Sequence, residues 1–343
     1  MTRKNAFIEA VVGIGTTELG GLDGLDTGSR ANLPDTIAWD AVQYLVGTGV
    51  HDYTNAIAER LDFRRLSEGP ELIALTYATL GHLLGPGQHT LTGVVIGLPV
   101  EVMEQASAAR SILNAWKQWL VGEHKFKLNK RNYTVAVQNV AVYSQPGGGF
   151  AAYAYNDQGQ EAITPDQWRA TTVIVDIGFN TLDVQAYQGG KTIRALTGGD
   201  TAGMRRAAEV LARTVGASYG VKLTPHQADA ILRMERPEIE TRLGFVQVAA
   251  EVAQAKAQAA AGIASYLENK LSAANGISVI RAIGGGSASL RAELLRAYPQ
   301  ATIPADPVGE NALGLARIGR RAWKDGNVVG LDPGFGGFKA VLL

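Results

Sequence analysis

A glycine-rich segment close to the C-terminal end, VVGLDPGFGGFKAV, has the composition of a phosphate-binding turn. Asp332 ends one apolar run, and Lys339 follows seven residues later on a second apolar run. The turn between them contains Gly334, Phe335, Gly336 and Gly337. Backbone N–H groups of such turns form concave anion sites, and glycine lets them approach phosphate without a Cβ in the way. Lys339 would add a positive charge for the phosphates.

A second segment, VIVDIGFNTLDVQ, has the same arrangement. Asp176 ends an apolar run, and the turn that follows contains Gly178, Phe179, Asn180 and Thr181. Facing each other across a common space, Asp176 and Asp332 would hold Mg²⁺ through its water shell, because this ion gives up water reluctantly. Asp183 has two interpretations at this stage, an exposed polar strand residue or a further site residue.

A third loop, IGGGSASL, follows an apolar run and opens a helix. It contains Gly284, Gly285, Gly286 and Ser287. Bare backbone at the start of a helix can pack against a phosphate or a flat base. Each loop alone is a weak signal, but three of them in one chain predict a nucleotide site.

The elements that must position these loops alternate between short β-branched runs and longer stretches of helical periodicity, which is typical of α/β proteins. We expect strands at Phe7–Val12, Ala41–Val46, Leu91–Leu98, Tyr133–Tyr143, Thr171–Asp176, Thr181–Tyr187, Ile277–Ile283, Val328–Asp332 and Phe338–Leu343. We expect helices at Pro70–Leu84, Glu101–Leu120 and Asn311–Trp323, and a mostly helical region at 201–271.

The three loops resemble those of the actin-like ATPases in the actin, sugar kinase and heat-shock chaperone superfamily, and within it the ParM/StbA-like bacterial and archaeal actins. The C-terminal segment resembles the first phosphate loop of that family, the segment around Asp176 the second, and the triple glycine the adenosine loop. Tyr44–Gly47, Gly97–Pro99 and Glu310–Gly314 are similar to further stretches of these proteins, so the resemblance extends over most of the chain.

The resemblance implies a fold of two ribonuclease H-like α/β domains, the first at residues 1–166 plus 306–343 and the second at 167–305. In the family the first phosphate loop lies at the N-terminus, whereas here it follows the adenosine loop. We therefore interpret the chain as circularly permuted, which is tolerated where the two ends of a domain lie close together. The last two strands should then pair with strands of the N-terminal half.

The resemblance also implies a function, a filament-forming protein that binds ATP or ADP with Mg²⁺, with GTP as an alternative nucleotide, and hydrolyses it. Asp332 and Asp176 would hold the metal and act in catalysis, and Gln145 occupies a position similar to the residue that orients the attacking water. The remaining loop residues would contact the nucleotide. The implied partners are further copies of the chain and a DNA-binding adaptor, in plasmid or DNA segregation or a prokaryotic cytoskeleton. A small-molecule kinase of the same superfamily and a non-polymerising nucleotide-binding scaffold are the alternatives.

Composition excludes several other classes. The 343 residues carry 32 Lys and Arg against 32 Asp and Glu, so we expect no direct nucleic-acid binding, for which a clear basic excess is usual. The absence of cysteine excludes disulfides and cysteine zinc sites. No apolar run approaches the ~18 residues of a membrane span, and we expect a cytoplasmic protein without direct membrane contact. The 41 glycines among 343 residues are roughly 12% of the chain, against the usual ~7%, and this excess predicts many tight turns or loops that approach a ligand closely.

Overall fold

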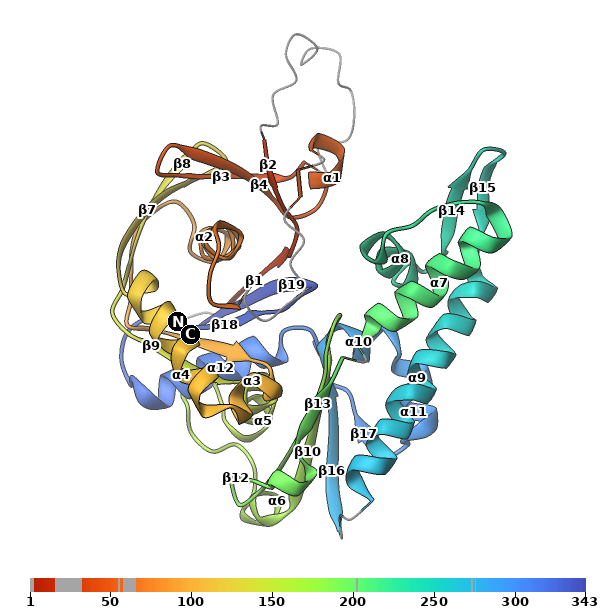
Figure 1. Ribbon diagram of the computed structural model, residues 1–343. Helices are drawn as coiled ribbons and strands as arrows, with labels where there is room; N and C mark the ends of the chain where they lie inside the picture. The colour runs from red at the N-terminus through yellow and green to blue at the C-terminus, as the bar shows by residue number, and fades with distance from the viewer. Residues whose placement is uncertain are drawn as a thin grey trace.

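The computed structural model describes residues 3–15, 33–54, 56–57, 66–201, 203–272, 274 and 276–343. The molecule has two halves, each built on a central β-sheet (Figure 1). The five-stranded sheet of the first half has the order β1-β19-β18-β6-β9, with β1 at Lys4–Glu9, β19 at Gly337–Leu342, β18 at Val328–Pro333, β6 at Gly93–Leu98 and β9 at Val140–Ser144.

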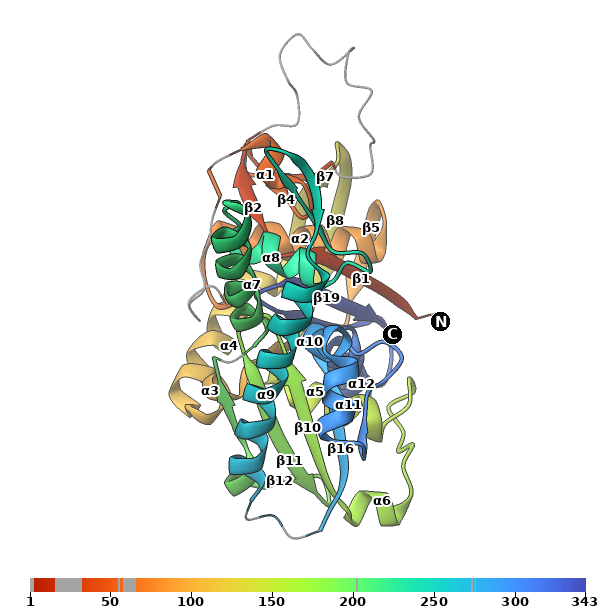
Figure 2. The same ribbon diagram turned by 90° about the vertical axis from the view of Figure 1, so that its right-hand side faces the viewer.

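The last two strands of the chain belong to this sheet of the N-terminal half. β19 pairs antiparallel with β1, with Lys4 opposite Leu342, and the two strands lie side by side in both views (Figure 1, Figure 2). β18 pairs antiparallel with β19 and parallel with β6, with Val329 opposite Val94. The prediction that these strands pair with the N-terminal half is therefore confirmed.

Helices cover both faces of the first sheet. The helix α12 (Glu310–Ala322) packs on β18 and β6, and α2 (Pro70–Leu84) packs on β1 and β19. Every residue of β18 and β6 is buried, as expected for central strands with both faces covered. A second, six-stranded sheet curves around α2 in the order β2-β4-β3-β7-β8-β5 (Figure 1), with β2 at Val12–Ile14, β4 at Val42–Val46, β3 at Asp35–Trp39, β7 at Gly122–Leu128, β8 at Arg131–Val137 and β5 at Gly87–Leu91.

The second half is built on a sheet of order β12-β11-β10-β16-β17, with β13 paired to β11. Its strands are β10 at Thr171–Ile177, β11 at Leu182–Gln188, β12 at Lys191–Thr192, β13 at Gly198–Asp200, β16 at Ile277–Ile283 and β17 at Ala301–Thr302. One face carries α7 (Met204–Tyr219), α8 (Pro225–Leu232), α9 (Ala249–Leu271) and α11 (Arg291–Ala297). The short α10 (Gly284–Ser289) follows β16 directly, and α5 (Gln145–Ala154) lies between this sheet and α12. The smaller helices are α1 (Val50–Tyr53) and α6 (Pro165–Arg169).

Four predicted elements differ from the structure. Phe7–Val12 is not one strand, because β1 of the first sheet ends at Glu9 and β2 of the second sheet begins at Val12. Tyr133–Tyr143 is not one strand, because the chain leaves one sheet at Val137 and enters another at Val140. The helix predicted at Glu101–Leu120 is interrupted at Gln105, whose backbone is not helical, into α3 (Val100–Glu104) and α4 (Ala106–Leu120). The region 201–271 contains a hairpin, β14 (Glu238–Thr241) and β15 (Gly244–Gln247), between its helices.

The other predicted strands and helices are present with shifts of a few residues at their ends. Within the described part of the chain, none of the helices has the length and apolar character needed to cross a membrane.

Candidate nucleotide site

A cavity of about 420 Å³ lies where the two halves meet. Its wall combines the β18–β19 turn of the first half with the β10–β11 turn and the start of α10 from the second half. The predicted site residues that line it are Gln145, Asp176, Gly178, Phe179, Asn180, Thr181, Gly284, Gly285, Asp332, Gly334, Phe335, Gly336, Gly337 and Lys339. The structure thus brings together loops that lie more than 150 residues apart in the sequence.

Asp332 and Lys339 are neighbours because their strands form a hairpin. The antiparallel register places the two residues directly opposite each other, and Lys339 Nζ lies 3.4 Å from Asp332 Oδ2. Gln145, at the start of α5, donates a hydrogen bond of 2.6 Å from Nε2 to Asp332 Oδ1. The Asp332 carboxylate is 2% exposed, and these contacts fix its orientation at the floor of the cavity.

Asp176 occupies the matching position on β10. Its Oδ2 accepts a 2.7 Å hydrogen bond from Nδ2 of Asn311. Burial, reinforced by the charges of Asp332 and Asp183, raises the pKa of Asp176 to about 7. The site therefore holds two close carboxyl groups whose repulsion a cation would relieve.

Asp183 is buried, so its interpretation as an exposed strand residue is wrong. It does not line the cavity. Its Oδ1 accepts a 2.9 Å hydrogen bond from the backbone N–H of Val100, which connects the two halves. Burial raises the pKa of Asp183 to about 6.

The donor set fits Mg²⁺. Asp176 and Asp332 both line the cavity, and their carboxylate oxygens would hold Mg²⁺ through its water shell. Among the described residues, no group of three acidic or histidine side chains could enclose a metal ion. An ion bound here would therefore complete its octahedron with water and substrate oxygens, the usual arrangement for Mg²⁺ at phosphates.

The β10–β11 and β18–β19 turns touch each other, and glycine permits this approach. A Cβ added at Gly336 would lie only 3.1 Å from Cβ of Phe179 in the opposite turn. Gly334 donates its N–H to the carbonyl groups of Asp332 and Gly337, and Gly178 donates to the carbonyl of Thr181, which closes both turns tightly. The two turns therefore lie against each other in the cavity wall.

The predicted adenosine loop is only partly in the cavity. Gly284 has φ of +85°, and a Cβ there would overlap Oδ1 of Asp176, so this position requires glycine. Gly286 packs against Ile177, and Ser287 is fully buried with its Oγ donating to the carbonyl of Ile283. Neither of these two residues lines the cavity, and their position instead fixes the start of α10.

The cavity wall also contains residues that the sequence did not single out as site residues. His226 and Asp229 of α8 and Arg233, the residue that follows its last turn, line the cavity at spacings of three and four residues. The Phe179 ring stacks on His226 at 4.7 Å, and Arg233 binds the Asp229 carboxylate with a shortest distance of 2.8 Å. This spacing was the signal available in the sequence, but it is common on helix surfaces.

Comparison with known proteins supports a single family. The model of the N-terminal domain of actin-like proteins matches residues 7–148, and the model of the C-terminal domain of the archaeal MreB-like actin homologue matches residues 174–296. A search of curated protein sequences found no match.

Solved structures of actin homologues have the same fold. The archaeal actin homologue Ta0583 in complex with ADP has a TM-score of 0.68 and 18% identity, over 93% of this chain and 99% of its own. A 15-stranded ParM filament from Clostridium botulinum gives 0.69 and 17%, over 92% of each chain. Bacillus thuringiensis ParM with ATP gives 0.62 and 11%, over 94% and 99%. Together, the two family models cover most of the sequence, and the chain belongs to the actin-like protein family with its two-domain fold.

Proposed function

We propose that this chain is a filament-forming nucleotide hydrolase that binds ATP, with GTP as the alternative, together with Mg²⁺. The observation that carries the proposal is the cavity at which two buried carboxyl groups, one lysine and two touching backbone turns meet. This combination suits a polyphosphate with a divalent cation better than it suits a neutral ligand.

Each group would have a distinct role. The turns and Lys339 would bind the phosphates, and Asp176 and Asp332 would hold Mg²⁺ through its water, where the ion would neutralise phosphate charge. Gln145 would orient the attacking water, because its side chain lies in the cavity wall beside Asp332, to which its Nε2 donates a hydrogen bond. The base would lie toward α8, beside Gly285 and Arg233.

The filament part of the proposal is supported by the similarity to the Clostridium botulinum ParM filament. We propose segregation of plasmid or other DNA through a DNA-binding adaptor as its cellular use, or a cytoskeletal role in the cytoplasm. The neutral net charge favours an adaptor over direct contact with DNA.

We also propose the domain division and the permutation. Residues 1–166 with 306–343 would form one domain and 167–305 the other. Pairing of β1 with β19 puts the two ends of the chain beside each other, which favours a permuted order of the family's strands.

The deciding experiment is sedimentation of the purified chain with ATP, ADP or a non-hydrolysable ATP analogue, with phosphate release measured in parallel. We expect pelleting with ATP and the analogue, and phosphate release that rises with assembly. Phosphate transfer only in the presence of a small-molecule acceptor would indicate the kinase alternative. Nucleotide binding without hydrolysis or assembly would indicate the scaffold alternative.

A further inference from the structure

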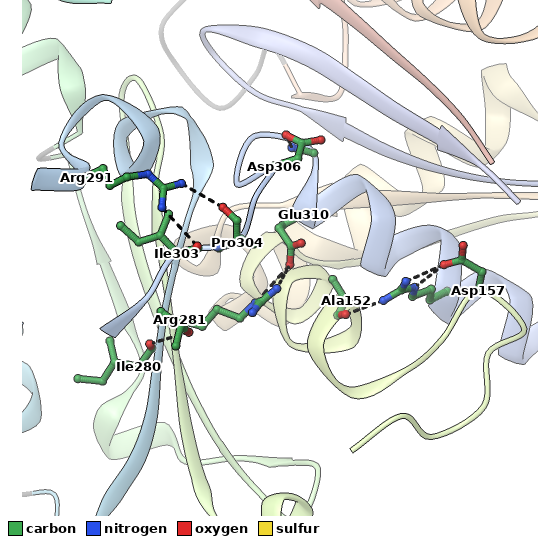
Figure 3. A network of polar contacts seen from close by, with 12 residues as sticks. Ala152, Asp157, Ile280, Arg281, Arg291, Ile303, Pro304, Asp306 and Glu310 are labelled. Atoms are coloured by element: carbon green, nitrogen blue, oxygen red, sulfur yellow. Dashed lines mark hydrogen bonds and ion pairs between the residues drawn. The ribbon is translucent and has the colours of Figure 1, made fainter. Parts of the chain in front are cut away.

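Two consecutive residues at the start of α12 contact the second half of the molecule. Glu310 forms an ion pair with Arg281 of β16 at 2.8 Å, and both side chains are largely buried (Figure 3). The next residue, Asn311, donates its amide hydrogen to Asp176 of β10 at 2.7 Å. The proposed function gives no role to Asn311 or to this ion pair. The following inference about them rests on that proposed function.

The backbone of Asn311 has little freedom to move. A Cβ at Gly148 of α5 would lie 2.6 Å from the carbonyl oxygen of Asn311, and one at Gly314 would overlap the backbone of Gly148. Because α12 and α5 touch through bare backbone, α12 cannot slide along α5 without a clash. The Asn311 amide is therefore presented to Asp176 from a rigid helix end.

The Asn311 side chain is not explained by stability alone. It is 3% exposed, and its Oδ1 has no hydrogen-bond partner among the described residues. A buried carbonyl without a partner costs free energy, whereas a leucine of similar size would not incur this cost. The favourable contact of this amide is the one that Nδ2 makes with Asp176.

This contact determines how the Asp176 carboxylate is turned. With Oδ2 bound to Asn311, the other oxygen lies against Gly284 at the start of the adenosine loop. Loss of the amide would leave the carboxylate free to rotate about its side-chain bonds. Asp176 would then lose its alignment with Asp332 across the cavity.

We propose that Asn311 is a positioning residue that holds the Asp176 carboxylate in the orientation needed for the Mg²⁺–nucleotide complex. The Arg281–Glu310 ion pair supports this contact by fixing the first turn of α12 against β16. The orientation of Asp176 thereby depends on a helix that packs on the sheet of the first half.

The test is Asn311→Leu, which removes the amide and keeps the volume. We expect kcat for nucleotide hydrolysis to fall at least tenfold and nucleotide affinity with Mg²⁺ to fall, while affinity in EDTA stays within twofold. The free energy of unfolding should change little, because removal of the unpaired Asn311 carbonyl offsets the hydrogen bond that Asp176 loses. The matched control is Arg317→Ala on the same helix, which loses its contacts with Asp157 and Ala152 outside the cavity and should keep the Mg²⁺ dependence.

A double-mutant cycle with Asp176→Asn isolates the mechanism. If Asn311 acts through Asp176, Asn311→Leu should change Mg²⁺-dependent nucleotide affinity less than twofold in the Asp176→Asn background. Equal losses in both backgrounds, or equal losses with Mg²⁺ and with EDTA, would overturn the proposal. Failure of the wild-type chain to bind or hydrolyse any nucleotide would refute the proposed function itself, so the two failures are distinguishable.

Discussion

Replacing Asp176 by Asn should stabilise the nucleotide-free protein, and the gain should increase with pH. Burial, followed by the charges of Asp332 and Asp183, raises the pKa of Asp176 from 3.8 to about 7 in the folded protein. The folded state therefore retains this proton at a pH where the unfolded chain has released it. The contribution of Asp176 to stability falls as the pH rises from about 4 to about 7 and is constant above that range.

The magnitude follows from about 1.4 kcal/mol per pH unit. At pH 8 the full difference applies, and the ionised carboxylate costs roughly 4 kcal/mol of unfolding free energy. At pH 5 the cost arises only from the interval between the unfolded pKa of 3.8 and pH 5, and it is roughly 2 kcal/mol. The advantage of Asp176→Asn should therefore grow by roughly 2–3 kcal/mol between pH 5 and pH 8.

Urea unfolding of the nucleotide-free wild type and variant at both pH values measures this difference. The control is Asp166→Asn, whose carboxylate is 91% exposed and should give no comparable change. ATP with Mg²⁺ should raise the midpoint of the wild type more than that of Asp176→Asn, because the variant lacks the metal-binding charge. A stability difference independent of pH would refute the argument from burial and repulsion.

Three further predictions concern the first sheet and the cavity wall. Moving residues 328–343 ahead of residue 4 with a short linker should preserve folding and nucleotide binding, whereas deleting them should abolish binding; a deletion variant that still binds nucleotide in equilibrium dialysis would contradict the assignment. Lys339→Ala should weaken ATP binding at least tenfold in calorimetry but leave adenosine binding within twofold, and equal losses for both ligands would exclude its role at the phosphates. Gly284→Ala should lower the unfolding free energy by roughly 1–3 kcal/mol because of its positive φ and the overlap with Asp176, and an unchanged urea midpoint would argue against this.

The loops of the site could be predicted from sequence because each one is local. In the C-terminal hairpin, the pairing register alone brings Asp332 and Lys339 together, and the turn glycines lie between them in sequence. The same holds for Asp176 and the turn after β10. Local patterns of this kind need no knowledge of the remaining chain.

The remaining parts could not be predicted because they depend on contacts between distant segments. The β-branched run YTVAVQNVAVY is interrupted only by the polar pair Gln138 and Asn139, which bond to Leu91 and Thr92 where the chain changes sheets. Asn311 reaches Asp176 across 135 residues, and the family-like stretch Glu310–Gly314 that contains it does not identify its partner. Tertiary packing, and not local pattern, decides both features.

The division of the site between the two halves has a mechanical consequence. The first half supplies Asp332, Lys339 and Gln145, and the second supplies Asp176 and its turn. Without a cation, the charge of Asp332 adds to burial in raising the pKa of Asp176, and repulsion between the two carboxyl groups opposes their approach. A bound Mg²⁺–nucleotide would replace the repulsion between the two carboxyl groups by attraction to the cation. It would then favour an arrangement with the two halves close together, to the extent that it binds this arrangement more tightly than a separated one. Hydrolysis and release of phosphate would weaken that preference, so the two carboxylates proposed to hold the metal would link nucleotide state to the relative position of the two halves.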